Sequence, residues 1–60
     1  MMWKTYHIWK RMHTEQTWTI TNQNVKARTD TEAQSRMQKK FRGFGLAHVS
    51  LIAIEEGKNP

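Results

Sequence analysis

The chain has no cysteine, one proline and three glycines among its 60 residues. Without cysteine no disulfide can form, and the common structural zinc sites lose their thiolate ligands. A chain this short buries only about 60% of the surface that its unfolded form exposes, so its core is marginal. Helix-on-sheet packing and self-association are the remaining sources of stability.

Long hydrophobic runs are also absent. No apolar run approaches the roughly 20 residues that a membrane helix needs, because the longest is interrupted by His48 and Ser50. The N-terminus, MMWKTYHIWKRM, carries charges where a signal peptide would have its apolar region. The lack of cysteine is compatible with a reducing compartment. We therefore expect a soluble, cytoplasmic protein with no membrane partner.

Acidic residues are few. The chain has 10 lysines and arginines against 5 aspartates and glutamates, which gives a formal net charge of +5. In so short a chain, this excess of basic residues favours a polyanionic or acidic partner, although it says nothing about the fold.

Two segments show the alternation of β-strands. The first is predicted over residues 3–12, with Tyr6, Ile8 and Met12 on one face and Trp3, His7 and Trp9 on the other. The second is predicted over residues 16–28, where Trp18 and Ile20 alternate with threonines. Its apolar positions then move from even numbers to odd ones, at Val25 and Ala27. We expect a bulge or bend near residues 22–24 that restores the facing.

A helix is predicted over residues 30–42. Thr29 and Glu32 have the spacing of a capping box, in which each residue satisfies a backbone N–H near the other. Ala33, Met37 and Phe41 recur four residues apart and form an apolar stripe, which Phe44 would complete. Gly43 suits the left-handed position after a helix end.

The last strand is predicted over residues 46–55, a nearly continuous apolar run, and residues 57–60 are predicted to be a disordered tail. A right-handed crossover from the second strand to the third places the third beside the first. The predicted fold is a single α+β domain of ββαβ order. Its three-stranded sheet has the order 2-1-3, and one helix covers one face.

Catalytic motifs are missing. Ser35 and Ser50 have no nearby His–Asp pair, and no glycine-rich phosphate loop is present. Glu55 and Glu56 are adjacent, so in a strand they point to opposite faces. His7, His13 and His48 with Glu15 could bind a transition metal, but their spacing is more typical of ordinary strand and turn histidines. We therefore expect no enzyme activity, no cofactor and no metal.

The uncovered sheet face is the main candidate surface. Trp3, His7 and Trp9 are expected there, beside the threonines at 17, 19 and 21 and near His48 and Ser50. Aromatic rings on an open sheet stack bases in some single-stranded RNA binders. The alternative, which we weight more heavily, is that these tryptophans belong to the core or to a homodimer interface.

The basic helix residues Arg36, Lys39, Lys40 and Arg42 have two interpretations. They are either a solvated face near the negative end of the helix dipole or a patch that contacts phosphates. A helix that reads DNA bases normally presents its N-terminal part, and here that part carries Asp30 and Glu32. Direct base readout is therefore disfavoured.

Several of these segments resemble those of short phage proteins. The plan of sheet plus capped helix is similar to that of small phage anti-CRISPR proteins and phage inhibitors of host RNA polymerase. More specifically, Trp18-Thr19-Ile20, the helix from Thr29 to Met37 and the G-x-G-x-A-H-V run at 43–49 resemble a family of short enterobacterial prophage proteins of unknown function. Some members carry zinc-linked cysteines, which this chain lacks.

The resemblance implies an accessory protein that binds a host or defence target stoichiometrically in the bacterial cytoplasm and inhibits or modulates it. Trp3, Trp9 and Trp18 are the expected anchors, with His7 beside them, because tryptophan often dominates interface energetics. The basic residues expected to steer an acidic partner are Lys10, Arg11, Arg36, Lys39, Lys40 and Arg42. Direct nucleic-acid binding and a dimeric assembly role are the two alternatives.

Overall fold

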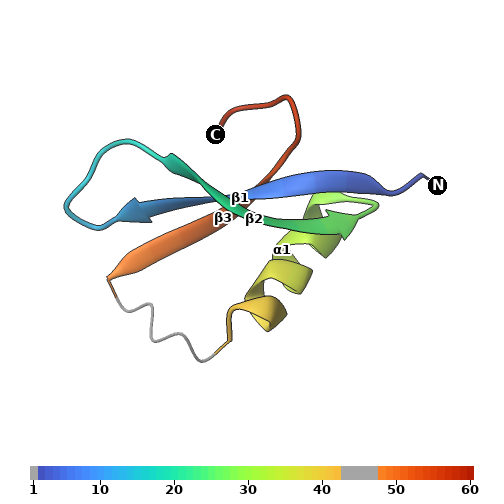
Figure 1. The fold of residues 1–60 in the computed structure, drawn as a ribbon. Coiled ribbons are helices and arrows are strands. Elements are labelled where there is room, and N and C mark those ends of the chain that lie inside the picture. Colours follow the sequence, from blue (N-terminus) through green and yellow to red (C-terminus); the bar gives the residue numbers. More distant parts are fainter. Residues whose placement is uncertain (1, 43–47) are drawn as a thin grey trace.

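The computed structural model describes residues 2–42 and 48–60. Within these ranges the chain forms β1 (Lys4–Met12), β2 (Thr19–Ala27), α1 (Asp30–Lys40) and β3 (Val49–Glu55). The described strands form one three-stranded sheet in the order β2-β1-β3, with β1 antiparallel to both neighbours. The helix lies on one side of this sheet (Figure 1). The predicted α+β fold with strand order 2-1-3 is confirmed.

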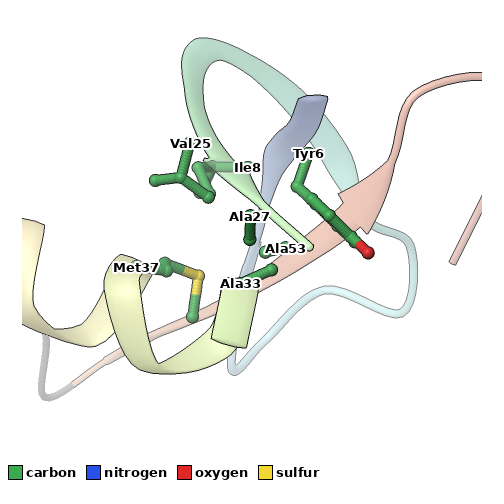
Figure 2. Close-up of a cluster of buried hydrophobic side chains, with 7 residues drawn as sticks. All are labelled: Tyr6, Ile8, Val25, Ala27, Ala33, Met37 and Ala53. Atoms are coloured by element: carbon green, nitrogen blue, oxygen red, sulfur yellow. The ribbon is translucent and has the colours of Figure 1, made fainter. Parts of the chain in front are cut away.

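The core lies between α1 and one face of the sheet (Figure 2). Its buried side chains are Tyr6, Ile8, Val25, Ala27, Ala33, Met37 and Ala53, and Phe41 and Leu51 pack against them. Ala33 and Met37 are the buried residues of α1, as the apolar stripe predicts. Three of the seven buried residues are alanines, so the core contains little side-chain volume.

The start of α1 differs in one detail from a capping box. The hydroxyl of Thr29 accepts a hydrogen bond from the N–H of Glu32 at 3.1 Å, as expected. The carboxylate of Glu32, however, accepts from the N–H of Arg28 at 3.2 Å. The helix ends at Lys40, before the predicted end at residue 42. The roles predicted for Gly43 and Phe44, and the start of the last strand at 46, lie outside the described residues.

The pairing of β2 with β1 contains a register shift. His7 pairs with Asn24, and Trp9 pairs with Ile20. Between these two pairs β1 has one residue, Ile8, whereas β2 has three, residues 21–23. The hydroxyl of Thr21 donates to the carbonyl of Ile8 at 2.8 Å and accepts from the N–H of Gln23 at 3.1 Å. These bonds satisfy backbone groups where the ladder is interrupted.

We expected an irregularity that brings the apolar residues of both halves of β2 onto one face of the sheet, and this shift does not do so. Two extra residues leave the alternation unchanged, because side chains repeat with period two. Val25 faces Tyr6 on the helix side, whereas Ile20 faces Trp9 on the other side. The two apolar halves of β2 therefore serve opposite faces of the sheet.

The residues that follow β3 form a turn that is hydrogen-bonded to β1 at its start. The N–H of Glu56 donates to the carbonyl of Thr5 at 2.9 Å. Gly57 has a φ of 91°, a conformation that favours glycine, and the N–H of Lys58 donates to the carbonyl of Glu55 at 3.0 Å. The segment then turns back on the side of the sheet away from α1 (Figure 1).

Candidate functional site

The sheet face opposite α1 gathers apolar side chains from all three strands. The pairing of Trp9 with Ile20 on β2 and Ile52 on β3 places these three side chains on that face. We call this surface the open face and define it by His7, Trp9, Arg11, Trp18, Ile20, Ile52 and Ile54. Ile20 is 49% exposed, and the other members are partly buried. An apolar patch on so small a domain is typical of a binding surface.

Polar contacts fix the two ends of the open face. The guanidinium of Arg11 lies 5.3 Å from the ring centroid of Trp18 and donates to the carbonyl of Glu15 at 2.8 Å. At the opposite end, Nε2 of His7 lies 3.1 Å from a carboxylate oxygen of Glu56. The aromatic and basic side chains are therefore held in place before any partner arrives.

The C-terminal tail covers part of the open face. Trp9 and Trp18 line a hollow of about 330 Å³ together with Asn59 and Pro60. The remaining lining residues, Gln16 and Thr17, come from the connection between β1 and β2. The tail thus lies beside the tryptophan end, while Ile20 stays exposed.

A second surface lies between the outer edge of β2 and α1. Its lining residues are Asn24, Val25, Lys26, Arg36, Lys39 and Lys40, which surround a hollow of about 370 Å³. We call this surface the basic groove. The ammonium of Lys40 donates to the carbonyl of Asn24 at 3.0 Å, across the groove. Four of its six lining residues are lysine or arginine, so positive charge is concentrated at this place.

Trp3 belongs to the groove side of the molecule. The guanidinium carbons of Arg28 and Arg36 lie 4.9 Å and 5.1 Å from its ring centroid. Glu32 contacts both arginines, at 3.6 Å and 3.4 Å. The expectation that Trp3 shares the open face with His7 and Trp9 is wrong. Trp3 precedes the first residue of β1, so strand alternation does not govern its direction.

The other expected site residues are divided between the two sides of the sheet. Lys10 pairs with Thr19 and Leu51 and lines a hollow on the helix side, whereas Arg11 lies on the open face. The threonines at 17, 19 and 21 do not form the expected row beside Trp9, since Ile20 occupies that place. Arg42 follows the helix end, where its N–H lies 3.5 Å from the carbonyl of Lys39.

Sequence reasoning missed Ile20, Ile52 and Ile54 as members of the candidate surface. The strand predicted over residues 46–55 was treated only as a nearly continuous apolar run, and its residues were not assigned to the uncovered face, although a single helix can cover only one face. Ile52 and Ile54 could have been identified from the sequence. When one helix covers one side of an apolar strand, every second side chain of that strand lies on the uncovered side.

The three histidines lie in two separate places among the described residues. His13 and His48 pack edge to face with ring centroids 6.4 Å apart, while His7 contacts Glu56. Among residues 2–42 and 48–60, no group of three or more His, Asp or Glu side chains could hold a metal ion. Burial raises the pKa of Tyr6, and the nearby carboxylates of Asp30 and Glu55 raise it further. Tyr6 is 1% exposed, so it is inaccessible to a substrate.

The described part of the chain therefore presents two separate surfaces, one apolar and one basic, on different sides of the molecule. No helix in it is long and apolar enough to cross a bilayer. Comparison with protein-family models, with curated proteins and with solved structures found no match for this chain.

Proposed function

We propose that this chain is a non-enzymatic binding protein that holds an acidic protein partner on its open face. Its role is that of a phage or prophage accessory protein, which binds a host or defence macromolecule in the bacterial cytoplasm and inhibits or modulates it. The observation that carries the proposal is the placement of Trp9 between Ile20 and Ile52 on the sheet face that α1 leaves uncovered. The phage origin is supported by sequence resemblance.

The open face contains residue types that contribute strongly to binding energy at interfaces. Burying apolar surface releases about 25 cal/mol for each Å² removed from water. Tryptophan is enriched among the few residues that dominate interfaces, and Trp9 and Trp18 lie together at one end of the face. The neighbouring isoleucines extend the apolar area and exclude water from it.

Charge favours an acidic partner over a second copy of the chain. Arg11 lies within the open face, where its guanidinium is close to the ring of Trp18. Complementary charge accelerates the encounter with an acidic surface. Two copies would each bring a net charge of +5 to the contact, and this repulsion opposes self-association.

A capture experiment with matched tryptophan variants tests the proposal. Tagged wild type, Trp9→Ala and Trp3→Ala are incubated with bacterial lysate, and the captured proteins are identified and then purified for titration. We expect one acidic protein to bind wild type and Trp3→Ala and to be lost with Trp9→Ala. Circular dichroism confirms that each variant is folded. Capture of the same proteins by wild type and Trp9→Ala would contradict the proposal.

Light scattering during size-exclusion chromatography tests whether the open face binds a second copy of the chain instead of another protein. If the open face binds a second copy, wild type has twice the monomer mass and Trp9→Ala returns to the monomer mass. That result would replace the acidic partner with a homodimer. We expect a monomer for both. The genes beside this one test the phage role, because a defence-inhibitor or lysogeny region supports it and a housekeeping operon contradicts it.

A further inference from the structure

We propose that the basic groove is a second binding site, for the phosphodiester backbone of a single-stranded nucleic acid. It lies along the outer edge of β2, next to α1, and shares neither Trp9 nor the isoleucines of the open face. The site is independent of the protein partner proposed above. A protein with both surfaces can hold a nucleic acid and a protein of the same complex together.

The positive charge of the groove comes from two elements that meet in space. Arg36, Lys39 and Lys40 are three and four residues apart, so they lie along one side of α1. Lys26 belongs to the edge strand β2 and also lines the hollow. Its pairing with Thr5 directs its side chain to the sheet side away from α1, so it adds positive charge on the other side of the strand edge. The helix dipole accounts for cations near the end of α1, but it gives no reason for a lysine on the neighbouring strand.

The cations of the groove are incompletely neutralised. Glu32 contacts Arg36 but is shared with Arg28. Within the ranges that the structure describes, Lys26 and Lys39 form no ion pair with a carboxylate. Like charges lining one groove repel one another, and a polyanion relieves that repulsion.

Trp3 adds a ring surface at the Arg36 end of the groove. It is 53% exposed although two guanidinium groups lie within about 5 Å of its centroid. Bases stack on tryptophan rings and on guanidinium planes in proteins that bind single strands. Cations along a groove with an aromatic ring beside them are the combination used by such proteins.

Two alternative ligands fit the groove less well. A peptide that added a strand to β2 would need its outer backbone groups, but Lys40 already occupies the carbonyl of Asn24. Insertion of α1 into a duplex groove is opposed by the carboxylates in its first turn, Asp30 and Glu32. A flexible single strand needs neither the strand edge nor the helix start.

A fluorescence titration at two salt concentrations tests the site. The probe is a short fluorescein-labelled oligodeoxythymidylate. If four cations neutralise four phosphates, wild-type affinity falls about 50-fold between 50 mM and 200 mM salt. For the double variant Lys26→Gln/Lys39→Gln, we expect weaker binding at low salt and a smaller decrease of about 7-fold over the same range.

Two controls decide whether the groove or the net charge is responsible. Lys10→Gln/Lys58→Gln removes the same charge from exposed positions outside the groove, and we expect it to bind nearly as wild type does. Equal weakening of both double variants would overturn the proposal. Trp9→Ala is expected to keep oligonucleotide binding, so the outcome is separable from that of the protein partner. A polyglutamate peptide that binds as tightly as the oligonucleotide would also overturn it.

Discussion

The side-chain amide of Gln34 pairs with both backbone polar groups of Ala53. Its Nε2 donates to the Ala53 carbonyl at 2.7 Å, and its Oε1 accepts from the Ala53 N–H at 3.1 Å. Ala53 lies in the middle of β3, at the edge of the sheet. One helix side chain therefore occupies the position that an additional strand would need, which protects this edge from pairing with another chain.

We expect Gln34→Ala to lower the free energy of unfolding by about 1–3 kcal/mol, because it leaves a partly buried N–H and carbonyl without partners. Urea denaturation measures the change. Gln38→Ala is the matched control, since Gln38 is exposed on the same helix, and its effect should stay within about 0.5 kcal/mol. Equal effects of the two substitutions would show that the pairing contributes nothing.

Thr21→Val should destabilise the fold although the two side chains have similar shapes. At the register shift, the hydroxyl of Thr21 donates to the carbonyl of Ile8 and accepts from the N–H of Gln23. Valine has no hydroxyl and can form neither hydrogen bond. We expect a loss of about 1–3 kcal/mol in thermal or urea unfolding. Thr19→Val, at an exposed position of the same strand, is the comparison. If Thr19→Val loses as much stability as Thr21→Val, the hydroxyl of Thr21 does not stabilise the register shift.

Removal of the helix cap should have a smaller effect. Thr29→Ala deletes the acceptor for the Glu32 N–H, and we expect a loss of about 1 kcal/mol. Thr31→Ala changes an exposed residue of the same turn and should be nearly neutral. Helicity by circular dichroism and urea denaturation report both. Equal stability of Thr29→Ala and wild type would mean that the cap is not needed.

The stability of the fold should fall in alkali because of Tyr6. Its pKa is raised in the folded protein by burial and by the nearby carboxylates of Asp30 and Glu55. A tyrosine in the unfolded chain titrates near pH 10, so the stabilisation is complete below about pH 10 and is lost as the pH rises towards the folded pKa. Unfolding of wild type and Tyr6→Phe in urea at neutral and alkaline pH measures this loss. Wild type should lose more stability than Tyr6→Phe, and parallel losses would contradict the assignment.

The strand order and the helix start could be predicted because local rules determine them. A right-handed crossover from β2 through α1 places β3 beside β1. The hydroxyl of Thr29 caps the helix by accepting a hydrogen bond from the N–H three residues later. The facing of β2 was predicted wrongly, because we expected a bulge to bring both apolar halves onto one face. The two-residue shift leaves the alternation unchanged, so Ile20 and Val25 stay on opposite faces.

The candidate surfaces were only partly predictable. His7 and Trp9 were expected on the open face and lie there, since both belong to the regular part of β1. Trp3 departs from them because two arginines distant in sequence hold its ring. The contact between the tail and the Trp9 end joins opposite ends of the chain, and no local pattern encodes it.

Alternation along β2 gives the two halves of this strand different roles. Its first half supplies Ile20 to the exposed side, and its second half supplies Val25 and Ala27 to the packed interior. The residues proposed for binding and the residues of the core are therefore different positions of the same nine-residue segment. A lineage of such proteins could change what it recognises by rewriting the beginning of that strand while its end keeps the molecule folded.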